Sequence, residues 1–149
     1  MATLQARMRD EMVIALKGGE KVRLSTLRLL AAAVKNREVE LGHELTDDEF
    51  VEVAMKEVKR RREAIEAYES AGREDRAAVE REELAVLQTY LPAALTDVEV
   101  DALIDEAVAE TGAIGPGDIG KVMSAFMAAA KGRADGRAVQ ARVRSRLGA

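Results

Sequence analysis

The sequence contains no cysteine and no tryptophan, a single histidine, and only two tyrosines and two phenylalanines among 149 residues. Without cysteine, no disulfide, thiol nucleophile or cysteine-ligated zinc or iron–sulfur site can form. The lone histidine, His43, leaves no histidine-pair metal site, and a histidine-dependent triad would have to use it. The scarcity of aromatic side chains leaves little on which bases, sugars or flavins could stack. These absences exclude much of the chemistry that enzymes use.

Long apolar runs are absent as well. No stretch approaches the roughly 18 consecutive apolar residues that indicate a membrane span. The first ten residues, Met1 to Asp10, have no apolar region and include an acid, so no signal peptide is expected. With no targeting segment, the expected compartment is the cytoplasm.

The residues that are abundant, alanine, leucine, glutamate, arginine, valine and lysine, are typical of helices, and proline occurs only twice. No segment alternates polar and apolar residues over a sustained length, so we predict an all-α fold without a sheet. Glycines, prolines and two Thr-x-x-Glu capping boxes, at Thr46 and Thr96, mark the helix ends. The expected helices run over about 4–17, 20–41, from Thr46 to Gly72, 75–91, 97–111, 118–131 and from Asp135 onward.

Apolar stripes give each expected helix an inward face. The first helix is expected to use Leu4, Met8, Met12 and Leu16, and the fourth to include Val79. In the third helix the stripe is interrupted by a charged residue, Arg61, which falls on its seam.

Two helical domains are predicted, residues 1–92 and 93–149, with the boundary at Leu91–Leu95. At about 1.5 Å per residue, the second and third helices would each be about 30–38 Å long. The N-terminal domain is therefore expected to be a long helical hairpin with flanking helices. The C-terminal domain is expected to be a small three-helix unit, which can bury only a modest core.

The formal net charge of −4 hides a strong segregation of charge along the chain. Residues 97–118 carry seven acids and no base, whereas residues 131–149 carry six bases and one acid. Lys21, Arg28 and Lys35 repeat every seven residues and therefore share one face of the second helix. Such a line could follow phosphates without reading sequence, or it could be an ordinary solvated face whose bases pair with acids. The overall acidity favours the second interpretation.

The motifs that could carry catalysis are weak. Carboxylates three residues apart are common on acidic helices, and the Glu-x-x-His elements of di-iron bundles are missing. Ser25 and Thr26 lie among bases, but no strained turn or glycine-rich frame surrounds them, so they are interpreted as core or helix-face hydroxyls. The segment Gly115–Lys121 matches the letters of a phosphate-binding loop, yet no strand precedes it and Val122 stands where a hydroxyl should ligate magnesium. We interpret that match as chance, although a glycine-rich helix start could contact a phosphate.

Several motifs nevertheless occur together in a specific order. They are Lys-Val-Arg-Leu-Ser-Thr-Leu-Arg-Leu-Leu at 21–30 with Ala-Val-Lys-Asn at 33–36, Leu-Gln-Thr-Tyr-Leu-Pro at 87–92, Gly-Lys-Val-Met at 120–123, and Lys-Gly-Arg-Ala-Asp-Gly at 131–136. In order and spacing, over essentially the whole chain, they resemble the YqeY family. The C-terminal part of that family is similar to the tail domain of GatB, the tRNA-binding subunit of the glutamine-dependent amidotransferase.

The resemblance implies an all-helical protein with a larger N-terminal domain and a smaller C-terminal three-helix domain. In GatB the tail domain contacts tRNA, while kinase and amidase chemistry lie elsewhere. Nothing in this chain resembles the amidase Ser-Ser-Lys machinery or the GatB kinase cradle, so an autonomous carbon–nitrogen ligase activity with glutamine as amido donor is not supported by the residues.

Three hypotheses follow from the sequence. The first is a non-catalytic module associated with RNA or tRNA, which would recognise backbone and shape because aromatics are scarce. The second is a component of a glutamine-dependent carbon–nitrogen ligase acting in tRNA-dependent amidation, and the third is a helical protein-interaction adaptor without RNA. Expected partners are tRNA or the amidotransferase and tRNA-synthetase machinery, with no metal, cofactor or membrane. The candidate RNA-binding residues are Lys121, Lys131, Arg133, Arg137, Lys21, Arg28 and Lys35.

Overall fold

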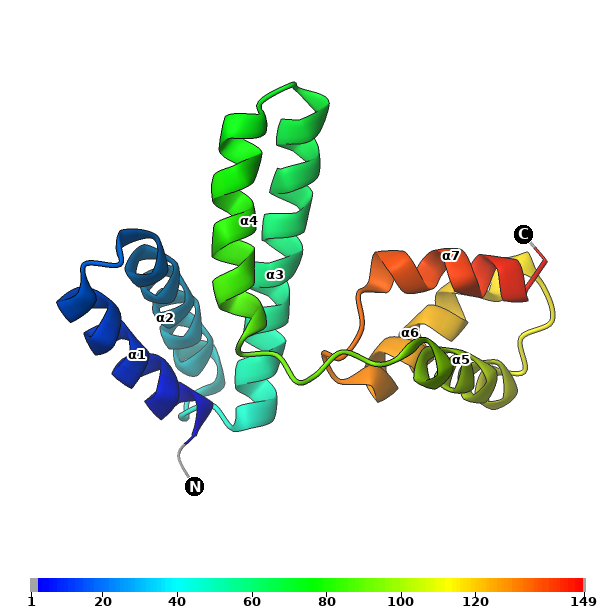
Figure 1. Cartoon of the computed structure of the whole chain (residues 1–149). Helices are drawn as coiled ribbons and strands as arrows, with labels where there is room; N and C mark the ends of the chain where they lie inside the picture. Colours follow the sequence, from blue (N-terminus) through cyan, green and yellow to red (C-terminus); the bar gives the residue numbers. More distant parts are fainter. Residues whose placement is uncertain (1–2, 149) are drawn as a thin grey trace. The chain divides into compact units, whose positions relative to one another are not determined.

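The computed structural model describes residues 3–148 and contains, in that range, seven α-helices, one short 3-10 helix and no strand (Figure 1). The all-α prediction is therefore confirmed. The chain divides into two compact units, one ending at Leu91 and the other beginning at Pro92.

The first unit consists of four helices: α1 (Leu4–Gly18), α2 (Lys21–Leu41), α3 (Asp47–Ser70) and α4 (Glu74–Gln88). Gly19 and Gly42 follow the first two helices with φ of 69° and 77°, the left-handed conformation that glycine adopts without steric cost. The predicted capping box at Thr46 is present. The Thr46 hydroxyl accepts from the Glu49 amide, and the Glu49 carboxylate accepts from the Thr46 amide.

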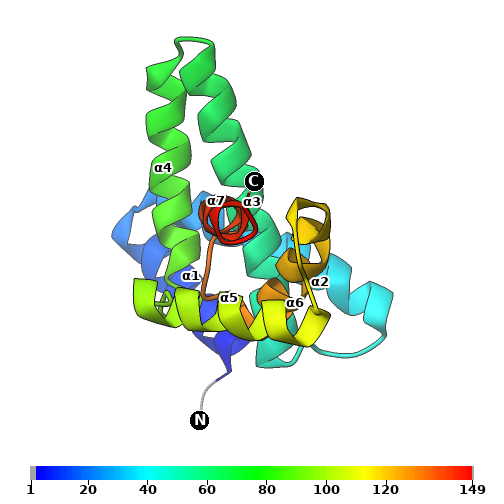
Figure 2. The same ribbon diagram turned by 90° about the vertical axis from the view of Figure 1, so that its right-hand side faces the viewer.

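The long hairpin of this unit consists of α3 and α4, which run side by side in both views (Figures 1 and 2). The lengths of the second and third helices favoured a hairpin built on those two. Instead, the short turn between Ser70 and Glu74 reverses the chain directly, and α1 and α2 pair with each other across the Gly18–Gly19 turn.

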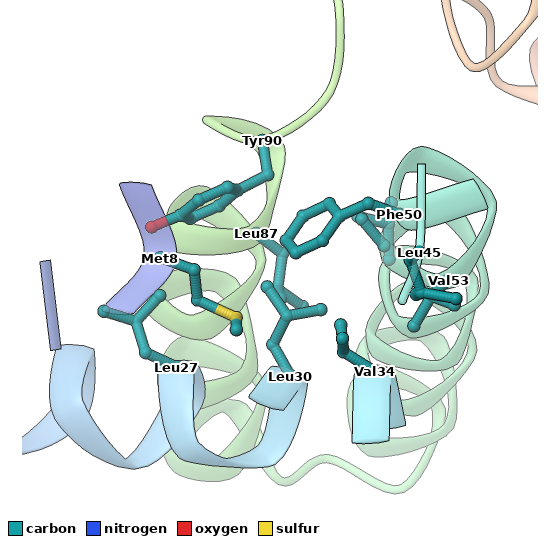
Figure 3. Packing of buried hydrophobic residues seen from close by; sticks show 11 residues of the cluster. Met8, Leu27, Leu30, Val34, Leu45, Phe50, Val53, Leu87 and Tyr90 are labelled. Atoms are coloured by element: carbon teal, nitrogen blue, oxygen red, sulfur yellow. The ribbon is translucent and has the colours of Figure 1, made fainter. Parts of the chain in front are cut away.

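One apolar cluster holds the four helices together (Figure 3). It contains the following buried residues: Met8, Leu27, Leu30, Val34, Leu45, Phe50, Val53, Ala54, Val58, Leu87 and Tyr90. The rings of Phe50 and Tyr90 lie with centroids 5.8 Å apart and planes inclined by 44°. Tyr68 is half-buried, so this unit presents no fully exposed aromatic ring.

Three predicted details differ from the structure. Leu16 is exposed and Ala15 is buried in its place, because residues spaced by four drift about 40° around a helix at each step. Val79 is likewise exposed, while Ala77 is completely buried. Helix α4 ends at Gln88 rather than Leu91, because the next three amides, before Pro92, bond to carbonyls three residues back, as in a 3-10 turn.

The second unit contains α5 (Asp97–Thr111), the 3-10 helix η1 (Pro116–Asp118), α6 (Ile119–Ala130) and α7 (Gly136–Arg146). The capping box at Thr96 and the Asp135 cap are confirmed. Helix α6 packs against α5 and α7. The buried core of the second unit consists of Val100, Ile104, Ala107, Val122, Phe126, Ala130, Val139, Val143 and Leu147.

Candidate nucleic-acid interface

The charges that are segregated along the second half of the sequence meet in the folded unit. Arg142 on α7 lies 3.2 Å from an Asp97 carboxylate oxygen and 3.3 Å from one of Asp101, and Arg146 lies 3.1 Å from Asp105. Three aspartates of the acidic helix α5 and two arginines of the basic helix α7 therefore neutralise one another. The charges separated in the sequence are partly joined as ion pairs in the fold.

Two candidate RNA-binding cations in this unit also have partners. Arg133 donates from Nε to the Ala93 carbonyl at 2.9 Å, and its Nη2 lies 3.5 Å from the Glu99 carboxylate. The Lys121 ammonium lies 3.2 Å from the Asp118 carboxylate. These contacts provide a structural role for both side chains.

The segment from Gly115 to Lys121 does not form a phosphate-binding loop. It begins with η1, and the Asp118 carboxylate accepts a hydrogen bond from the Ile114 amide at 3.0 Å. The Ile114 amide and the Lys121 ammonium lower the pKa of Asp118, so its negative charge persists at neutral pH. A phosphate beside Lys121 would meet that carboxylate.

The remaining candidates of the second unit lie at its surface. Lys131 ends α6 in a left-handed conformation with φ of 45°, and it forms no ion pair with a carboxylate of residues 3–148. Arg137 lies in the first turn of α7, where its backbone amide donates to the Asp135 carboxylate. The two residues belong to different helices.

Helix α2, unlike the second unit, presents several candidate RNA-binding cations in a row. Lys21, Arg28 and Lys35 are all exposed, and none has a carboxylate of the described chain within ion-pair distance. Seven residues correspond to a rise of about 10.5 Å and a drift of about 20°, so the three cations form a nearly straight line about 21 Å long. By contrast, Arg23 and Arg37 on the same helix are paired with Glu11 and Glu40. We call Lys21, Arg28 and Lys35 the α2 cation line.

Short and aliphatic side chains cover the rest of the outer face of α2. Ser25, Ala32 and Asn36 are exposed next to the cation line, and Val22 and Leu29, 36% and 51% exposed, lie beyond them. The Ser25 hydroxyl donates to the Val22 carbonyl at 3.1 Å, so it belongs to the helix surface as the sequence suggested. The neighbouring Thr26 hydroxyl is buried and donates to the same carbonyl at 2.8 Å.

A polar network at the other side of α2 fixes its position. The Glu11 carboxylate accepts hydrogen bonds from Arg7, Arg23 and the Tyr90 hydroxyl, and the Arg7 guanidinium lies 4.4 Å from the centre of the Tyr90 ring. Burial raises the pKa of Glu11, but the hydrogen bonds from Tyr90 and Arg7 outweigh it and hold that pKa below its usual range. The network joins α1, α2 and the end of α4. Sequence reasoning missed it, because no local pattern connects residues 79 positions apart.

The charged residue that interrupts the apolar stripe of α3 pairs with a cluster of carboxylates. The Arg61 side chain is 12% exposed, and it lies within 3.6 Å of carboxylates of Glu57, Glu80 and Glu83. Its Nε approaches Glu83 to 2.8 Å but is not aligned for a hydrogen bond. Burial and the charge of Glu83 raise the pKa of Glu80, whereas Arg61 opposes them. The cluster joins α3 to α4 beyond the apolar core.

The single histidine lies at the surface of the described part of the chain. His43 is exposed, with Nδ1 2.7 Å from the Glu44 carbonyl and Nε2 3.5 Å from the Glu49 carboxylate. Within residues 3–148, no group of three or more acidic or histidine side chains could hold a metal ion. No helix in that range is long and apolar enough to cross a membrane.

Fold and surface together define an all-helical protein of two compact units, with a line of cations on its second helix that has no acidic partner among the described residues. The chain belongs to the Yqey-like protein family, whose pattern matches residues 5–147. It is 30% identical, over 96% of its length and 80% of the relative, to altered inheritance of mitochondria protein 41, mitochondrial, of Pyrenophora tritici-repentis. It is also 29% identical to an uncharacterized protein of Schizosaccharomyces pombe, over 60% of this chain and 72% of that one.

Proposed function

We propose that this protein is a non-catalytic module that binds RNA, with tRNA as its first candidate, through the α2 cation line. The observation that supports this function is that Lys21, Arg28 and Lys35 lie in a row with no acidic partner among residues 3–148, whereas Arg23 and Arg37 on the same helix are paired. Cations held in a row without local counterions neutralise a polyanion more effectively than cations already paired, because no internal ion pair has to break.

The proposal also covers the setting in which the module works. Its partners would be tRNA and the amidotransferase or tRNA-synthetase machinery, and its compartment the cytoplasm. The mitochondrial name of one relative belongs to that relative. The Ser25 and Thr26 hydroxyls, which donate to a backbone carbonyl, and the exposed loop position of His43 are consistent with a module that performs no chemistry of its own.

The test is titration of a fluorescently labelled tRNA transcript, followed by anisotropy at several salt concentrations between 25 and 200 mM. The variant Lys21→Gln/Arg28→Gln/Lys35→Gln removes the cation line. Loss of three phosphate contacts should weaken binding and lower the slope of log K against log salt by about 2 to 3. A matched control, Lys56→Gln/Lys59→Gln/Arg144→Gln, removes three exposed cations from other helices and should leave the slope within about one unit. Equal losses in both variants, or no binding at 25 mM salt, would refute the proposal.

The exposed aliphatic residues Val22 and Leu29 favour a second candidate function, that of a protein-interaction adaptor. An adaptor would form a complex with purified amidotransferase subunits in size-exclusion chromatography without tRNA, and Val22→Ser/Leu29→Ser would abolish it. The ligase-component hypothesis makes a different prediction, because addition of this protein should then stimulate glutaminase or transamidation activity of those subunits.

A further inference from the structure

Around the outer face of α2, the side chains change from charged to short with increasing angle from the cation line. Taking 100° per residue, the cation line occupies one edge, and Ala32, Ser25 and Asn36 follow within about 20° to 60° of Lys21. All three are exposed and short. The cations thus lie beside a low, partly polar strip, and the exposed Val39 continues their line one turn after Lys35.

The aromatic residues of the first unit cannot contribute to this face. Phe50 and Tyr90 lie in the apolar core and Tyr68 is half-buried on α3. Recognition of unpaired RNA relies on aromatic side chains or arginine planes that stack on splayed bases. The α2 face has no such platform beyond Arg28.

Double-stranded RNA presents a surface that suits a low, polar strip beside cations. Its minor groove is wide and shallow, and it displays 2′-hydroxyls between two phosphate edges. A helix with short side chains can approach such a surface closely, whereas the deep and narrow major groove excludes it.

Resting on the proposed RNA-binding function, we propose that the outer face of α2 docks on double-stranded A-form RNA, with the cation line on phosphates and Ser25 and Asn36 on 2′-hydroxyls at the edge of the minor groove. The 2′-hydroxyl is both donor and acceptor. The Ser25 oxygen donates its proton to the Val22 carbonyl and keeps a lone pair to accept from a 2′-hydroxyl. The Asn36 amide can donate and accept.

The experiment compares three probes of one sequence: an RNA hairpin with a 16-base-pair stem, the same hairpin in DNA, and the unpaired single RNA strand. Anisotropy titrations with the full chain at 50 mM salt should give the tightest binding to the RNA hairpin. Two hydrogen bonds to 2′-hydroxyls predict a preference of about 10-fold over DNA. Ser25→Ala/Asn36→Ala should reduce that preference to about 2-fold while DNA affinity stays unchanged. The control Ser124→Ala/Gln88→Ala alters exposed polar residues elsewhere and should preserve the preference.

The outcomes separate this inference from the function on which it rests. If the single strand or the DNA hairpin binds as tightly as the RNA hairpin, the proposal of docking on double-stranded A-form RNA is wrong. The proposed binding of RNA by the cation line is then still decided by its own variant. If no probe binds, both fail. Leu29→Ser provides a further check, because Leu29 lies beyond the polar strip and its loss should leave RNA-hairpin affinity within about 2-fold. A large loss with Leu29→Ser would indicate apolar contact with unstacked bases and would overturn the duplex assignment.

Discussion

Replacing Arg61 by methionine is expected to destabilise the first unit through the three carboxylates that it leaves behind. Methionine preserves an unbranched apolar stem and removes only the charge and its donors. Glu57, Glu80 and Glu83 have side chains only 11%, 22% and 16% exposed, so water can compensate for the missing cation only in part.

The magnitude follows from the burial of the cluster. Removing one partner of a fully buried ion pair costs about 3–5 kcal/mol. Because the carboxylates retain some contact with water and can take up protons, we expect a loss of about 2–4 kcal/mol in the free energy of unfolding at pH 7. The control Arg60→Met removes a neighbouring cation that is 74% exposed, and it should cost less than about 1 kcal/mol.

The pH dependence provides the more specific signature. The pKa of Glu80 is raised in the folded protein, so the native state binds its proton more tightly than the unfolded chain does. Stability from this group is complete below the unfolded pKa and is lost as pH rises through the folded pKa. Without Arg61, whose charge opposes that shift, the pKa of Glu80 rises further. The deficit of Arg61→Met should therefore shrink markedly between pH 7 and pH 4.5.

Urea denaturation followed by circular dichroism at 222 nm at both pH values measures this difference. Adding Glu83→Gln to Arg61→Met should restore part of the stability at pH 7, because one of the uncompensated charges is removed. The reasoning would be refuted by a deficit below about 1 kcal/mol at pH 7, or by one that does not change with pH.

Three further substitutions test other parts of the structure. Tyr90→Phe removes the hydroxyl that donates to Glu11 and should cost about 1.5–3 kcal/mol in urea unfolding, whereas a change below 0.5 kcal/mol would contradict that bond. Phe126→Ala empties a fully buried site and should cost about 3–5 kcal/mol in the second unit, measured by amide hydrogen exchange of α5 to α7. Thr46→Ala should cost about 1 kcal/mol through loss of the α3 cap, seen as faster exchange in its first turn; unchanged exchange there would count against the cap.

Local rules predicted the helices of this fold well, because the signals that end a helix lie next to the residues they act on. Thr46 and Glu49 are three residues apart, and their reciprocal hydrogen bonds are present. The wrong prediction that Leu16 faces inward also had a local cause, because residues that repeat every four positions drift off a straight helix face.

Contacts between helices could not be predicted in the same way. The apolar pattern predicted that Arg61 lies on the inward seam of its helix. It could not predict the ion-pair partners Glu80 and Glu83, because they come from the next helix. In the sequence the bases of α7 are far from any cluster of acids, but in the fold Arg142 pairs with aspartates 41 and 45 positions earlier. Conversely, the seven-residue repeat of Lys21, Arg28 and Lys35 was visible, but only the fold shows that these cations lack acidic neighbours in the described chain.

The distribution of aromatic residues also makes the protein a convenient optical system. Both tyrosines, Tyr68 and Tyr90, lie in the first unit, and the second unit has only phenylalanine. With no tryptophan, absorbance near 280 nm and tyrosine emission report on the first unit alone, whereas helical circular dichroism reports on both. One melt recorded with the two signals would thus reveal whether the halves of this chain unfold together or in sequence, without any label.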